Sequence, residues 1–226
     1  MKEAGTGSRP GSSAAASRPR LQLPGVRAPK PLLSPESEQR LTARQLQLLD
    51  ELEELVQVGG LADLTMAQIA AQVNCSMRTL YGIAPSRDEL VLTIFDRRLH
   101  RIGRAAVESL DPDQPPLALL GAYLRAANEA VQPSTVTYAR ELANIPGAGR
   151  LLDSHEGYVM AMARSLLDRA VDEGHIDALD TTSLAHVLGG LGREFARPDV
   201  AELAASSPKD TADAITEIIL RGLKRV

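Results

Sequence analysis

The sequence predicts an all-α protein of about nine helices, and three features of the chain support this fold class. Apolar residues recur three and four positions apart through most of the 226 residues, which is the spacing of a helix face. Aromatic residues make up only 3% of the chain and tryptophan is absent, so the core must be aliphatic, which suits packed helices better than a sheet. Capping residues and Gly or Pro breaks bound the periodic segments, and we find no convincing strand pattern.

Residues 1–40 precede the first predicted helix and differ from the rest in composition. Residues 1–35 hold four Gly, six Pro and five Ser without hydrophobic periodicity, so we expect them to be disordered. Residues 1–40 carry seven basic and three acidic side chains, although the whole chain has a net charge of −4. The sequence therefore predicts a disordered basic tail over residues 1–40.

The first helix is predicted from about Thr42 to Val58, with Leu48 and Leu52 on one face. Gly59 and Gly60 end it, since glycine is the residue that most often terminates a helix.

A short helix, a turn and a second short helix are predicted next. Thr65 and Gln68 have the spacing of a capping box, which satisfies amide donors at the start of the first of these helices. Asn74 stands in the turn and tolerates a left-handed backbone, and Ser76 can cap the second helix. The inward residues of that helix are Leu80 and Ile83, and its outward residues are Met77, Arg78 and Tyr81. A helix-turn-helix of this kind places the exposed face of its second helix in the DNA major groove.

Six later helices complete the predicted fold. Ser86 and Glu89 form a second capping box, which opens a long helix to about Ser109. The other five extend over residues 117–131, between Pro133 and Pro146, over residues 150–173, from Asp180 to Pro198, and from Pro208 onward.

The segment Leu48 to Leu90 resembles the DNA-binding domain of the TetR family of bacterial repressors. LLDELEELVQVGGL resembles the family's first helix, and LTMAQIAAQVNCSMRTLYGIAPSRDEL resembles its helix-turn-helix and the start of its fourth helix. The order LY followed by PS-[KR]-x-E-L is the discriminating part. The family usually has LYYHF at one stretch where this chain has Leu80, Tyr81, Gly82, Ile83 and Ala84.

The resemblance implies two domains and a homodimer. Residues 41–86 would form the helix-turn-helix domain, and residues 87–226 a helical domain for effector binding and dimerisation. In such proteins the last two helices pair with their copies, and three glycines in the first of them would allow close approach; a kinked or weak helix is the alternative. The expected interface residues are Leu184, Leu188, Gly189, Gly192, Phe195, Ile215 and Ile219.

The resemblance also assigns candidate contacts to double-stranded DNA. Arg78 would contact a guanine edge or a phosphate, and Tyr81 a phosphate. Arg87 stands where the family keeps a lysine that meets the DNA backbone. Thr65, Ser76 and Met77 complete the set, although capping explains Thr65 and Met77 is equally well surface decoration. The basic tail is either an arm that reaches DNA or a passive segment.

An effector cavity in the middle helices is the third implication, with Tyr123, Tyr138 and Tyr158 as candidate lining residues. Each of them is as readily a core or surface residue. The effector would be a small molecule that the sequence does not identify.

Several classes of protein are excluded or disfavoured by composition and motifs. One cysteine excludes an internal disulfide and a cysteine-rich zinc site, and it fits a reducing cytoplasm. No apolar run reaches the length needed to span a membrane. We find no enzyme motif, no cofactor motif and no metal-ligand spacing among the four histidines. Together with these exclusions, the resemblance implies a cytoplasmic homodimeric repressor that binds a palindromic operator and is released by ligand. The alternative is a helical dimer that has lost specific DNA binding and acts as a ligand-binding or interaction protein.

Overall fold

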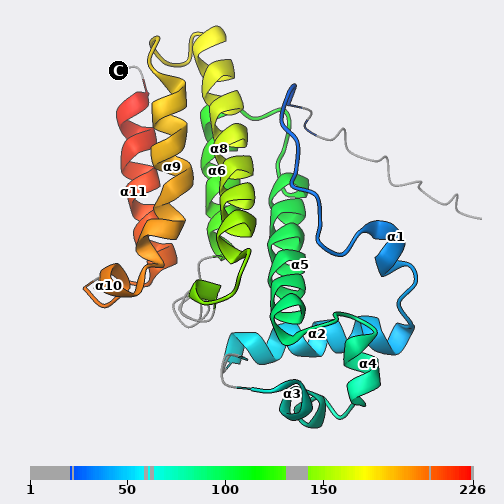
Figure 1. Ribbon diagram of the computed structural model, residues 1–226. Helices are drawn as coiled ribbons and strands as arrows, with labels where there is room; N and C mark the ends of the chain where they lie inside the picture. The colour runs from blue at the N-terminus through cyan, green and yellow to red at the C-terminus, as the bar shows by residue number, and fades with distance from the viewer. Residues whose placement is uncertain are drawn as a thin grey trace, which may run out of the picture.

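The computed structural model describes residues 21, 23–58, 61, 64–130, 142–203 and 205–224. Within these residues every regular element is a helix, so the predicted all-α fold class is confirmed (Figure 1). The elements are α1 (Pro35–Glu38), α2 (Ala43–Val58), α3 (Met66–Gln72), α4 (Met77–Tyr81), α5 (Arg87–Glu108), α6 (Pro116–Ala127), the 3-10 turn η1 (Asn128–Ala130), α8 (Ala148–Asp172), α9 (Thr181–Phe195), α10 (Pro198–Ala201) and α11 (Pro208–Leu223).

The N-terminal unit consists of α2, α3 and α4 packed around the first half of α5 (Figure 1). Leu48, Leu52, Ile69, Leu80 and Leu90 are fully buried at its centre. These residues lie on the apolar faces that helical periodicity predicted, and burying them against one another holds α2 and the two short helices α3 and α4 together.

The larger unit is a bundle of α6, α8, α9 and α11, with the second half of α5 packed against it (Figure 1). Leu120, Tyr123, Leu166 and Leu167 lie at its centre and are at most 1% exposed. The predicted boundary at residue 86 does not separate the two cores. Phe95 of α5 and Leu151 at the start of α8 both belong to the core of the N-terminal unit, so α5 and α8 connect the two units directly.

The helices match the predicted ranges closely, with three exceptions. The short helices α1 and α10 contain four residues each, too few to show a periodic pattern, and were not predicted. The helix predicted between Pro133 and Pro146 lies largely outside the described residues. None of the described helices combines the length and apolar character that crossing a membrane requires.

The described part of the predicted disordered tail is packed instead. Leu21, Leu23 and Val26 contact the core of the bundle, and Leu33 contacts the core of the N-terminal unit. The backbone N–H of Leu32 donates a 2.7 Å hydrogen bond to the Asp96 carboxylate on α5. Disorder is therefore the wrong expectation for this stretch, because its few apolar side chains find partners distant in sequence. Residues 1–20 lie outside the described residues.

Candidate DNA-binding face and internal cavity

The helix-turn-helix has the local geometry that its sequence predicts. Thr65 and Gln68 form the capping box at the start of α3, with a 2.9 Å hydrogen bond from the Thr65 N–H to the Gln68 side-chain oxygen. Asn74 has a φ of 46°, the left-handed conformation that the tight turn requires. Ser76 Oγ accepts a 3.1 Å hydrogen bond from the Thr79 N–H at the start of α4. Local hydrogen bonds therefore set the angle at which α4 leaves the turn.

The outer face of α4 presents Arg78 and Tyr81 to solvent, and Tyr81 keeps 50% of its surface exposed. Leu80 points the other way and is fully buried, which fixes the rotation of this short helix. Met77 was predicted to point outward, but it is half-buried and packs against the core of the N-terminal unit. Thr65 and Ser76 are exposed. Their DNA contacts, like those of Arg78 and Tyr81, stay predictions.

Arg87 holds together two parts of its own chain. Its Nε donates to the Leu64 carbonyl oxygen at 3.0 Å, and its Nη2 donates to the Leu61 carbonyl oxygen at 2.7 Å. Nη1 lies 3.0 Å from the Asp88 carboxylate. The guanidinium thus ties the start of α5 to the connection between α2 and α3. Contact with a DNA phosphate stays a prediction for Arg87, and bracing is the role that its hydrogen bonds support.

Replacing Arg87 with methionine is expected to lower the free energy of unfolding by about 1–3 kcal/mol, because two carbonyl acceptors lose a charged donor. Urea denaturation followed by circular dichroism measures this change. Arg125→Met is the matched control, since Arg125 is 61% exposed and its ion pair with Glu217 is long, at 3.9 Å. An unchanged unfolding midpoint, combined with weaker DNA binding, would contradict the bracing role and favour a phosphate contact.

Ion pairs between α5 and α2 form a second connection. Arg97 Nη1 lies 2.6 Å from Asp50 Oδ1, and Arg101 pairs with Glu53, whose side chain is 3% exposed. Burial raises the pKa of Glu53, and the positive charges of Arg101 and Arg97 oppose that rise. These ion pairs join α2 to the middle of α5.

A cavity of about 740 Å³ lies among α5, α6, α8 and α9. Its wall is mainly apolar, with a few polar groups, which is typical of a small-molecule site. Lining residues include Leu99, Gly103 and Val107 of α5, Tyr123 of α6, Leu152, Tyr158 and Val159 of α8, and Gly189 and Gly192 of α9. Leu21, Ala28 and Pro29 of the N-terminal segment also contribute to the wall.

Two of the three tyrosines predicted to line a cavity do so. Tyr123 is 1% exposed and Tyr158 is half-buried, and both border the cavity. Burial raises the pKa of both hydroxyls, so both remain neutral phenols that can donate or accept hydrogen bonds. Tyr138 lies outside the described residues. Whether any tyrosine binds an effector stays a prediction.

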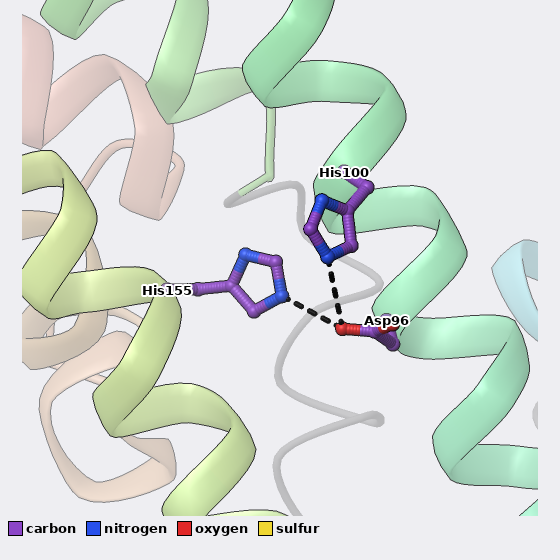
Figure 2. Close-up of side chains that lie close together, drawn as sticks. All are labelled: Asp96, His100 and His155. Carbon is purple, nitrogen blue, oxygen red and sulfur yellow. Dashed lines mark hydrogen bonds and ion pairs between the residues drawn. The ribbon is translucent and has the colours of Figure 1, made fainter. Parts of the chain in front are cut away.

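A polar cluster beside this cavity was not predicted from the sequence. His155 Nε2 lies 2.9 Å from Asp96 Oδ1, and His100 Nε2 lies 3.5 Å from the same oxygen (Figure 2). The two imidazole rings meet edge to face with centroids 4.8 Å apart. Burial lowers the pKa of His100, Asp96 opposes that shift, and His155 and Arg104 add to it. The sequence could have indicated part of this cluster, because the four-residue spacing of Asp96 and His100 places both on one helix face. It could not have indicated His155, which is distant in sequence.

Solved structures with the same arrangement of helices come from several prokaryotes. A TetR transcription regulator from Haloarcula marismortui matches with a TM-score of 0.68 and 18% identity over 80% of this chain and 98% of that chain. A transcriptional regulator from Cytophaga hutchinsonii matches with a TM-score of 0.62 and 14% identity over 81% of this chain and 100% of that chain. A TetR family transcriptional regulator from Thermus thermophilus matches with a TM-score of 0.55 and 22% identity over 79% and 100% of the two chains.

The chain has the TetR fold. The likeness extends over nearly the whole length of each of these structures, so it includes the helix-turn-helix and the helical bundle together. No protein-family model and no curated protein sequence matches the chain. At identities of 14–22% the likeness to these structures is one of fold alone.

Two of the seven residues predicted at the dimer interface are buried within the single chain, and the other five are half-buried. Leu188 is 2% exposed and Gly192 is buried. A Cβ added at Gly189 would lie 2.7 Å from Met160 Cγ and 3.3 Å from the Met160 Cα, so this glycine allows α9 to approach α8 of the same chain. Packing within the chain is the role that these contacts support, and interface roles for Leu188, Gly189 and Gly192 stay predictions.

The remaining predicted interface residues are half-buried: Leu184, Phe195, Ile215 and Ile219. Leu184 and Ile219 pack against the core of the bundle. The apolar side chains that α9 and α11 leave in solvent are different ones, with Val187 49% exposed and Ile218 70% exposed. Both helices lie at the edge of the bundle away from α5 (Figure 1).

Proposed function

We propose that the protein is a DNA-binding transcriptional regulator rather than an enzyme. It acts as a homodimer on a palindromic operator, represses by excluding polymerase, and is released when a small molecule enters the cavity. The observation that carries the proposal is the helix-turn-helix at its place in a TetR fold, with Arg78 and Tyr81 exposed on α4. The structures that share the fold are described as transcription regulators.

The proposed dimer forms through the exposed faces of α9 and α11. Val187 of α9 and Ile218 of α11 supply exposed apolar side chains on two helices that pack against each other. A symmetric pair of α4 helices must lie about 34–36 Å apart to enter successive major grooves. Pairing through the bundle, at the end of the chain, leaves both helix-turn-helix units free to meet DNA.

The proposed release works through α5, which belongs to both units. Leu90 and Ile94 of α5 are buried in the core beside α3 and α4, whereas Leu99, Gly103 and Val107 line the cavity. A ligand that fills the cavity pushes on the second half of this helix. The ion pairs of Arg97 and Arg101 then carry the displacement to α2, which changes the spacing of the two α4 helices.

Replacing Arg78 with alanine is expected to weaken operator binding by about 1–3 kcal/mol and to relax preference at one base position. Selection from a pool of randomised DNA duplexes defines the operator, and fluorescence anisotropy then measures the affinity of each variant. Tyr81→Phe is expected to weaken binding to all duplexes equally, because loss of one phosphate contact carries no sequence information.

Arg125→Ala is the matched control, since it removes one exposed arginine from α6, outside the helix-turn-helix. The DNA-binding proposal would be rejected if the selection enriched no sequence, or if the wild type and Arg78→Ala bound DNA with equal affinity. The helical dimer without specific DNA binding would then be the better description.

A further inference from the structure

We propose that Asp96, His100 and His155 bind one divalent transition-metal ion of the Zn²⁺ class beside the cavity. The three side chains come from two helices, with Asp96 and His100 one turn apart on α5 and His155 facing them from α8 (Figure 2). One ligand atom from each residue lies within 4.8 Å of the other two.

Two of the three distances between the ligand atoms are close to those of a tetrahedral site. Bonds of about 2.0–2.2 Å to zinc place neighbouring ligand atoms roughly 3.3 Å apart. The distances to Asp96 Oδ1 are 2.9 Å from His155 Nε2 and 3.5 Å from His100 Nε2. Both imidazoles point the same nitrogen at a single oxygen (Figure 2), so small rotations of the three side chains would open a position for an ion between them.

The surroundings of Asp96 are those of a ligand held in place. Its side chain is only 4% exposed, and its second oxygen, Oδ2, accepts the 2.7 Å hydrogen bond from the Leu32 N–H. Such a bond orients a metal-binding carboxylate, and it leaves Oδ1 facing the two imidazoles, where it would ligate the ion in place of its contact with His155. His100 Nε2 is buried and makes no hydrogen bond within the described part of the chain. A buried carboxylate next to a nitrogen without a hydrogen bond is stabilised by a cation between them.

The donor set selects the class of ion. Two imidazole nitrogens and one carboxylate oxygen suit Zn²⁺ and its neighbours in the first transition row, whereas Ca²⁺ and Mg²⁺ require sites composed of oxygen ligands. His100 and His155 both border the cavity. The fourth coordination position therefore faces the cavity, where water or a donor atom of a small molecule can occupy it.

Cobalt titration of the full-length protein, freed of any affinity tag and dialysed against chelator, tests this site. Tetrahedral Co²⁺ absorbs visible light, so the spectrum reports both the stoichiometry and the geometry. We expect one Co²⁺ per chain, displacement by Zn²⁺ but not by Mg²⁺, and a rise of the unfolding temperature with added Zn²⁺. His100→Gln and His155→Gln should each weaken binding by about 100-fold or more, as loss of a ligand costs at least as much as loss of a supporting partner.

His186→Gln is the matched control, because His186 is exposed on α9. Circular dichroism of each variant confirms that it is folded, and the two ligand variants on different helices check each other. Absence of a Co²⁺ spectrum from the wild type overturns the proposal. Equal binding by the wild type, His100→Gln and His155→Gln overturns it as well, since the ion would then lie elsewhere.

A consequence for DNA binding rests on the proposed function. An ion held by α5 and α8 fixes the position of α5 relative to the bundle, so Zn²⁺ should change operator affinity in the wild type and not in His155→Gln. Failure of the wild type to bind any DNA would reject the proposed function alone. Failure of the cobalt titration would reject the metal site alone.

Discussion

Replacing Gly189 with leucine is expected to lower the free energy of unfolding of the single chain by about 3 kcal/mol, the upper end of the usual range for overpacking. The first added atom would already lie 2.7 Å from Met160 Cγ and 3.3 Å from two backbone atoms of Met160. The methionine side chain can move aside, but the backbone of α8 cannot do so without separating the two helices. Urea denaturation at several protein concentrations measures the loss and separates it from any change in dimerisation.

Alanine substitutions at two adjacent glycines provide the matched comparison. A Cβ at Gly190 would meet only Glu156 Oε1, at an ordinary 3.5 Å, so Gly190→Ala should gain up to about 1 kcal/mol of helix propensity. Gly189→Ala has the same intrinsic gain, which the contact with Met160 should cancel or reverse. If Gly189→Leu instead keeps the wild-type stability and becomes monomeric, Gly189 acts at the dimer interface after all.

The double replacement of Val187 and Ile218 by glutamate is expected to convert the proposed dimer into a folded monomer. Each substitution puts a charge where apolar surface would be buried, and two such changes should raise the dimer dissociation constant by at least about 100-fold, or roughly 3 kcal/mol. The fold should survive, because the two side chains are 49% and 70% exposed in the single chain. Sedimentation velocity over a range of concentrations measures the change.

Leu32→Glu is the control for this experiment, since Leu32 is 55% exposed and belongs to the N-terminal segment beside α5. Operator affinity should decrease together with dimerisation, because each half-site then binds one chain independently. A double variant that stays dimeric would place the interface on another surface.

The DNA-binding unit is the part of the molecule for which sequence patterns were most informative. Each of its local features involves a single residue or two residues three positions apart: the capping box of Thr65 and Gln68, the left-handed Asn74, and the cap at Ser76. Such interactions depend on the local backbone and little else. The single error on α4, the orientation of Met77, concerns a side chain that packs against the core formed by several helices.

The candidate sites depend on contacts between distant segments, and there the sequence was less informative. Periodicity shows that Leu188 and Gly189 lie on an apolar face, but a face packed on α8 and a face packed on a second chain have the same pattern. His155 is 59 positions from Asp96, so no spacing rule could connect them. The resemblance suggested a phosphate contact for Arg87, and its bracing hydrogen bonds could not be foreseen because the carbonyl oxygens it binds are 23 and 26 positions away.

The sequence by itself determined the all-α class, the positions of the major helices within the described residues, and the helix-turn-helix, because apolar periodicity and end capping act over a few residues. Only the tertiary structure decided which side of each helix is covered within the chain. It packed the N-terminal segment against α5, turned Gly189 toward α8, and brought Asp96, His100 and His155 together. The physical reason is that an apolar helix face is stabilised by burial against any complementary apolar surface. Which surface is available to it depends on the whole folded chain.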